Sequence, residues 1–211
     1  MTSSRDAVTA LPETVAGPAD LQRLQHAARV HHTPCGDGPL VWHAWGGGEP
    51  VLLLHGGAGS WTHWVRNIAA LVRAGRSVWA PDLPGFGDSA RAAGCDDADQ
   101  MPAWLAQGLQ ALLGPRAVDA AGFSFGGLVG AYLAVQHPGQ GASLRLVGAP
   151  AGAGREKLAA LSASQKWSVR RLERAAGALA VEKEMPSDPA KAGTGGASSA
   201  RLGGASVDFA Y

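Results

Sequence analysis

The sequence predicts an α/β fold in which a mainly parallel sheet carries helices on both faces. Short apolar runs bounded by turn residues alternate with longer stretches in which apolar residues recur every three or four positions. Such alternation is typical of parallel sheets, because a helix usually connects one parallel strand to the next. A length of 211 residues is enough for one domain with a sizeable core.

Residues 1–29 are predicted to form an N-terminal arm followed by a short helix. The arm is mostly small and polar. Pro18 suits the first turn of a helix that carries Leu21, Leu24 and Ala28 on one face.

The core is predicted to span residues 30–154. It opens with two antiparallel strands, 31–35 and 40–45, joined by the turn at 36–39. The continuous apolar run at 51–54 is the pattern of a strand covered on both faces.

Helices and strands then alternate along the rest of the core. The expected helices are 61–72, 98–113 and 128–136, and the expected strands are 77–80, 118–123 and 143–148. Ser60 stands at the N-cap position of the first helix, and Gly114 and Pro115 terminate the second.

Three loops follow three of the predicted parallel strands. They are His55-Gly56-Gly57, residues 82–89 and the turn at Ser124. The carboxyl ends of parallel strands form the ligand crevice of an open α/β sheet, so the three loops are expected to face one site.

Ser124 lies between Gly122 and Gly126, where a strand turns abruptly into a helix. Small residues on both sides allow a tight turn that holds the serine Oγ above the sheet. Gly-x-Ser-x-Gly alone is a weak signal, because about 0.3 matches are expected by chance at this composition. The motif becomes a specific signal because it follows the other two loops in this order.

These motifs closely resemble the α/β-hydrolase family from about residue 30 to residue 150. The matching segments are His-Gly-Gly, Asp-Leu-Pro-Gly-Phe-Gly-Asp-Ser and Gly-Phe-Ser-Phe-Gly-Gly, in that order. The resemblance implies that Ser124 is the catalytic nucleophile and that the backbone N–H groups of Gly57 and Phe125 form the oxyanion hole. It also implies a cofactor-free serine hydrolase that acts on a small ester or on a carbon–carbon bond next to a carbonyl.

Other polar residues of these loops are expected to support the site. His55, next to Gly56, is expected to orient the glycine loop by hydrogen bonding, with a role as a base the less favoured alternative. Asp82 and Asp88 are expected to stabilise the turns of their own loop.

The resemblance also implies a carboxylate and then a histidine after the nucleophile. No histidine follows His137, which lies about 20 Å from Ser124 if the intervening residues are helical. Where some relatives place the acid, this chain has Ala149–Gly152. We therefore expect impaired activity, with a non-catalytic remnant or a small-ligand-binding protein as the alternative function.

Residues 155–211 are expected to form an atypical tail. Only 9 of these 57 residues are Leu, Ile, Val or Phe, below the roughly 20% associated with a foldable core. A helix at about 156–181 followed by disorder is expected, and the hydrolase core is then incomplete at its C-terminus. A frameshift near residue 155 or a truncation would account for this composition.

Composition narrows the classes of partner. A net charge of +1 gives no electrostatic bias toward nucleic acid or anionic membranes. The sequence contains no apolar stretch of about 20 residues and no apolar N-terminal signal, which favours a cytoplasmic location. Cys35 and Cys95 have neither metal-type nor disulfide-type spacing, so no metal is expected. A small-molecule carbonyl compound is the expected substrate.

Overall fold

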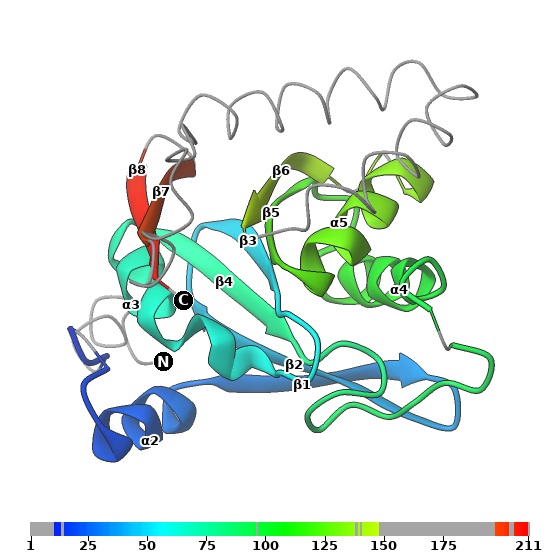
Figure 1. The fold of residues 1–211 in the computed structure, drawn as a ribbon, viewed down its shortest axis with the longest axis horizontal. Coiled ribbons are helices and arrows are strands. Elements are labelled where there is room, and N and C mark those ends of the chain that lie inside the picture. Colours follow the sequence, from blue (N-terminus) through cyan, green and yellow to red (C-terminus); the bar gives the residue numbers. More distant parts are fainter. Residues whose placement is uncertain are drawn as a thin grey trace, which may run out of the picture.

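A six-stranded sheet forms the centre of the computed structural model (Figure 1). The structure describes residues 11–13, 15–95, 97–137, 139, 141–147, 197–202 and 205–210, with side chains before residue 140. The strands are β1 (Arg29–Cys35), β2 (Gly38–Gly46), β3 (Glu49–Leu54), β4 (Arg76–Pro81), β5 (Val118–Phe123) and β6 (Gly141–Val147).

The strand order is β1-β2-β4-β3-β5-β6. β1 and β2 form an antiparallel hairpin, and β2 also pairs antiparallel with β4. The pairs of β3 with β4, β3 with β5, and β5 with β6 are all parallel. The prediction of a mainly parallel sheet with an antiparallel opening is confirmed.

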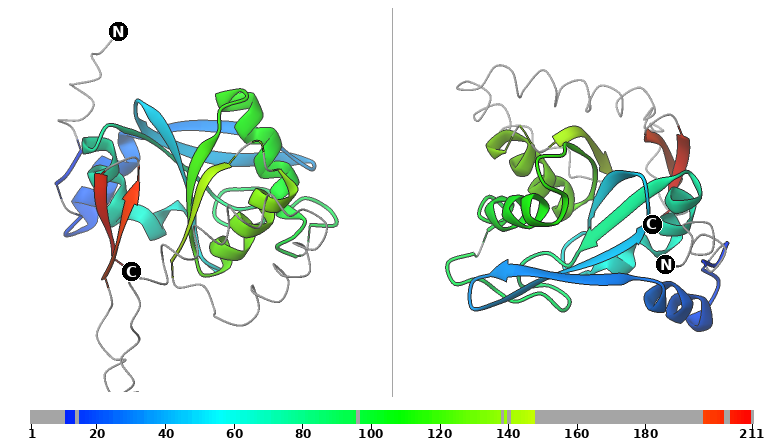
Figure 2. Two further views of the ribbon diagram at one scale, coloured as in Figure 1. Left: turned by 90° about the horizontal axis from the view of Figure 1, so that it is seen from above. Right: turned by 180° about the vertical axis from the view of Figure 1, so that it is seen from behind.

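Helices cover both faces of the sheet, as predicted (Figure 2). They are α2 (Pro18–His26), the 3-10 helix η1 (Trp61–Trp64), α3 (Val65–Arg73), α4 (Met101–Leu113) and α5 (Phe125–Gln136). α4 and α5 contribute to one hydrophobic core, while α2, η1 and α3 contribute to a second.

The apolar run of β3 supplies both cores, because successive side chains of a strand point to opposite faces. Leu52 and Leu54 belong to the core beside α4 and α5, and Val51 and Leu53 to the core beside α3. All four are fully buried. This is why the run is continuously apolar rather than alternating.

Three predicted helices differ at their N-terminal ends, and one of them is α5, which begins at Phe125 instead of Leu128. The helix expected at 61–72 starts as η1, because the His63 N–H bonds the Ser60 carbonyl three residues earlier. Ser60 is its N-cap, as predicted, and its Oγ accepts the Thr62 N–H at 3.3 Å. α4 begins at Met101 instead of Ala98, with Pro102 in its first turn, where the missing proline N–H costs no hydrogen bond.

The tail differs from the expected disorder in two segments. β7 (Ala197–Leu202) and β8 (Ala205–Ala210) form an antiparallel hairpin, and β8 lies beside α3 (Figure 1). The low content of large apolar residues in this tail did not predict a strand in either segment. The helix expected at 156–181 lies outside the described residues.

Cys35 and Cys95 are buried, and the two do not form a disulfide with each other. None of the helices in the part of the chain that the structure describes combines the length and the hydropathy of a membrane span.

Candidate active site

Ser124 lies at the junction of β5 and α5 in a conformation rare for residues with a side chain. Its φ is 49° and its ψ is −113°. Unlike Ser60, Ser124 makes no capping hydrogen bond with its side chain, although it occupies the N-cap position of α5. The residue as a whole is half-buried.

Gly122 and Gly126 leave the room that this turn needs. A Cβ on Gly122 would lie 2.5 Å from the Gly126 carbonyl oxygen, and one on Gly126 would lie 2.2 Å from the Leu54 carbonyl oxygen. These neighbours are backbone atoms, which cannot turn aside as a side chain can. The two glycines therefore allow α5 to begin directly against the end of β3.

Gly57 and Phe125, the predicted oxyanion-hole residues, lie near each other. A Cβ on Gly57 would be 3.7 Å from the Cβ of Phe125, an ordinary contact distance, and Gly57 is exposed. Phe125 is the first residue of α5, and the first N–H groups of a helix have no partner within it. The positive end of the helix dipole adds to the attraction of this N–H for a developing negative charge.

His55 is completely buried, and its two ring nitrogens bond backbone groups of different loops. Nδ1 donates to the Gly56 carbonyl at 2.8 Å, and Nε2 accepts the Leu83 N–H at 2.8 Å. These bonds define the neutral tautomer with its proton on Nδ1. Burial lowers the pKa of His55, which keeps the ring neutral.

His63, which the motifs did not single out, lies against the same glycine loop. Its Nδ1 accepts the Gly56 N–H at 3.2 Å. Its ring lies edge-on to Phe123, with 5.6 Å between ring centroids. The one signal in the sequence is its position on the first helical turn after the loop, three residues beyond the N-cap Ser60.

The Asp82 carboxylate joins its own loop to the start of η1. Oδ1 accepts the Trp61 N–H at 2.7 Å, and Oδ2 accepts the Asp88 N–H at 3.0 Å. Ser89 Oγ donates to the Asp82 carbonyl at 2.6 Å and accepts the Val41 N–H at 2.8 Å. Asp82 thus occupies both carboxylate oxygens with backbone bonds, while Asp88 contributes a backbone N–H to the turn.

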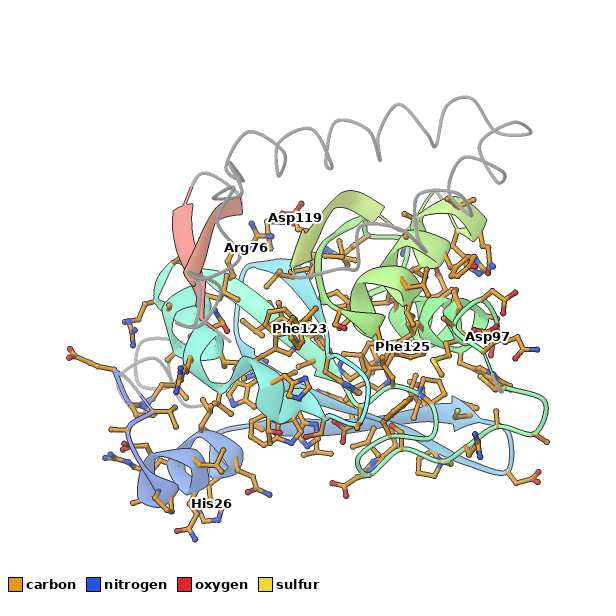
Figure 3. All side chains as sticks on the ribbon, in the orientation of Figure 1. His26, Arg76, Asp97, Asp119, Phe123 and Phe125 are labelled. Carbon is orange, nitrogen blue, oxygen red and sulfur yellow. The ribbon has the colours of Figure 1, made fainter. Side chains whose placement is uncertain are left out.

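Aromatic rings surround the junction at Ser124. Phe86, from the Asp82 loop, lies 5.8 Å from Phe125 and 5.6 Å from His55, measured between ring centroids. Phe123 and Phe125 flank Ser124 in sequence, and both lie near the middle of the view in Figure 3. The site therefore combines backbone donors with apolar ring surfaces.

His137 caps the C-terminal end of α5, whereas Ser124 lies at its N-terminal end. The structure does not bring these two residues together. Ala149–Gly152, where the acid was sought, lie outside the described residues.

Comparison with known proteins defines the family. The profile of the alpha/beta hydrolase fold matches residues 49–179, which include all three loops and extend beyond residue 155. The chain belongs to the alpha/beta hydrolase fold family.

Individual relatives match about half of this chain. It is 34% identical over 119 residues to the 2-hydroxy-6-oxononadienedioate/2-hydroxy-6-oxononatrienedioate hydrolase of Comamonas testosteroni, covering 55% of this chain and 41% of that protein. It is 35% identical over 112 residues to the 2-hydroxy-6-oxo-6-phenylhexa-2,4-dienoate hydrolase of Burkholderia cepacia, and the match covers 52% of this chain and 39% of that protein. The chain spans about two fifths of the length of these curated relatives.

Solved structures agree on the fold. Cfl2 from Burkholderia cenocepacia has a TM-score of 0.54 and 29% identity, over 58% of this chain and 42% of that chain. The epoxide hydrolase CorEH, solved without ligand, has a TM-score of 0.52 and 30% identity, over 56% of this chain and 41% of that chain.

Proposed function

We propose that this chain carries the nucleophile half of a serine hydrolase that acts on a small ester or on a carbon–carbon bond next to a carbonyl. Ser124 attacks the carbonyl carbon, and the oxyanion that forms accepts hydrogen bonds from the N–H groups of Gly57 and Phe125. The hydroxyl proton of Ser124 passes to water, and the intermediate collapses as the bond to the leaving alcohol or carbon fragment breaks and that fragment takes up a proton. Water then hydrolyses the acyl-enzyme to the acid and the free serine. No cofactor takes part in these steps.

The observation that carries this proposal is the backbone of Ser124. A non-glycine residue at φ 49° and ψ −113° is strained, and such strain is concentrated at functional sites. Its hydroxyl is not used as a helix cap. The relatives named above support the substrate class, since their names describe hydrolases of oxo-dienoic acids.

The 211 residues contain no histidine after His137, and the two histidines that contact the glycine loop, His55 and His63, each accept a backbone N–H with a ring nitrogen. We therefore propose that this chain alone turns over substrate slowly. A site without its base retains some rate from the oxyanion hole and from binding, several orders of magnitude below a complete enzyme.

The test is hydrolysis of p-nitrophenyl acetate by the purified chain and by Ser124→Ala. We expect slow release of p-nitrophenol above the rate in buffer, which Ser124→Ala abolishes, and an acetylated peptide containing Ser124 in mass spectrometry. A rate equal in both proteins would contradict the hydrolase proposal and favour the non-catalytic alternative. A rate typical of complete enzymes would show that the base is present.

A further inference from the structure

The ring of His63 is fitted against the glycine loop that precedes it. A Cβ on Gly59 would lie 2.1 Å from His63 Cε1 and 2.5 Å from Nε2, so the ring occupies the space of a missing side chain. A Cβ on Gly56 would lie 2.8 Å from the Phe123 ring, which itself contacts the His63 ring. Gly56 thus lies against the Phe123 ring, while its N–H bonds His63.

The two peptide groups that flank Gly56 are both held by side chains. Its N–H donates to His63 Nδ1 at 3.2 Å, and its carbonyl accepts from His55 Nδ1 at 2.8 Å and from the Gly59 N–H at 3.2 Å. The Gly56–Gly57 peptide is trans, so its N–H points away from its carbonyl. Holding the Gly56 carbonyl against His55 therefore sets the direction of the Gly57 N–H.

From this geometry we infer that His63 is a positioning residue of the oxyanion hole, an inference that rests on the function proposed above. By holding the Gly56 N–H, His63 restricts rotation about Gly56, the residue through which the loop reaches Gly57. Glycine has the widest backbone freedom of any residue, so this loop needs such a restraint. A preorganised donor needs no reorientation when the oxyanion forms, and misplacement by about 1 Å can cost up to about 100-fold in rate.

The same hydrogen bond argues against His63 as the missing base. Since Nδ1 accepts the Gly56 N–H, a neutral ring carries its proton on Nε2. The lone pair that a general base requires is already engaged. His63 therefore acts on the reaction through Gly56 and Gly57.

Four variants separate this role from simple packing. His63→Leu removes the acceptor, whereas the Oδ1 of Asn in His63→Asn can accept near the position of Nδ1. Gly59→Ala keeps the histidine but places a Cβ where the ring lies, and Gly59 has no positive φ that would strain an alanine. His26→Leu is the matched control, because His26 is exposed at the end of α2, far from Phe123 and Phe125 (Figure 3).

The experiment measures phenylboronic acid binding and amide exchange by NMR, neither of which depends on turnover. Boron forms a bond to Ser124 Oγ, the hydroxyl proton passes to solvent, and the tetrahedral adduct places an oxygen in the oxyanion hole. We expect His63→Leu and Gly59→Ala to weaken binding about 10-fold and to speed exchange of the Gly56 amide. His63→Asn should recover most of both properties, and His26→Leu should match the wild type.

An unchanged dissociation constant in His63→Leu would overturn the inference, as would faster exchange at Gly56 without weaker binding. If His63→Leu does not fold, the inference is tested by comparing Gly59→Ala with His63→Asn. Boronate binding and exchange of the Gly56 amide are again the two measurements. If boronate binding responds as expected while p-nitrophenyl acetate shows no turnover that depends on Ser124, the positioning role stands and the hydrolase proposal fails. If the wild type binds no boronate through Ser124, both are overturned.

Discussion

Ser124 combines the proposed nucleophile with an unfavourable backbone conformation. A side chain at φ 49° and ψ −113° costs about 1 to 3 kcal/mol, and the surrounding packing has to offset this cost. Ser124→Gly relieves the strain, while Ser124→Ala removes only the hydroxyl. We therefore expect Ser124→Gly to be more stable than Ser124→Ala by about 1 kcal/mol after the extra chain entropy of glycine is subtracted, as measured by urea unfolding.

Ala58 provides an internal comparison, because it also has a positive φ, 55°. Ala58→Gly should likewise be at least as stable as the wild type. Equal or lower stability of Ser124→Gly than of Ser124→Ala would contradict the strained turn.

The residues of the candidate site differ in how far the sequence could predict their positions in the fold. Ser124, Gly57 and Phe125 follow from motifs whose order along the chain is distinctive, and the structure places all three around one junction. His63 did not follow, because its bond to Gly56 depends on the direction of one ring after a 3-10 turn. No spacing rule relates a loop glycine to an imidazole seven residues later.

At the scale of elements, Arg76 ties together three parallel strands at the end of the sheet opposite the site. From β4 it donates to the Glu49 and Pro50 carbonyls of β3, both at 3.1 Å. It also forms an ion pair with Asp119 of β5 at 2.6 Å (Figure 3). The Arg76 side chain is only 7% exposed. Its loss would therefore leave the two carbonyls and the Asp119 carboxylate without these hydrogen bonds, in a place where little water can replace them.

We expect Arg76→Met to lower the free energy of unfolding by about 2 to 4 kcal/mol. Asp119→Asn should cost less, because Arg76 keeps its bonds to the two carbonyls. Arg116→Met is the control: its ion pair with Glu49 is 3.7 Å long and exposed, so its loss should cost under about 1 kcal/mol. Urea unfolding of the three variants tests this order, and a loss in Arg76→Met no greater than in Asp119→Asn would contradict the role of Arg76 as a link across β3.

Element boundaries were the part of the fold that the sequence predicted least well. Most predicted strands are shorter than the observed ones, because pairing extends into residues of ordinary composition, such as Arg29 and Gly46, whereas the strand at 118–123 has the predicted bounds. The start of α5 was placed three residues late, since Gly126 and Gly127 have low helix propensity. Tertiary packing of this helix against β3 and β5 overrides that preference.

For the whole molecule, buried and half-buried histidines predict loss of stability in mild acid. Burial lowers the pKa of His31, His43, His55 and His137 in the folded state. As the pH falls through the unfolded-state value of about 6.5, the unfolded chain binds these protons first, so unfolding becomes more favourable. We expect the melting temperature to fall steadily from pH 7.5 to pH 5.5, with up to about 1.4 kcal/mol per pH unit for each histidine.

His43 offers a direct check of this pH dependence. It stacks on Trp61 with 5.1 Å between ring centroids, and it is 4% exposed. His43→Phe keeps an aromatic ring there but removes the titrating group, so it should flatten the slope, whereas His26→Phe at the exposed end of α2 should not. A wild-type melting temperature that is constant over this range would contradict the prediction.

The order of strands in the sheet also determines which strands lack a neighbour while the chain is being synthesised. β3 lies between β4 and β5, yet it is synthesised before either of them. At about 5 to 20 residues per second, β5 follows the end of β3 by roughly 3 to 13 seconds. During that interval Leu52, Leu53 and Leu54 have at most one neighbouring strand. We therefore expect the nascent chain to expose these leucines until β5, which leads into the turn at Ser124, pairs with β3.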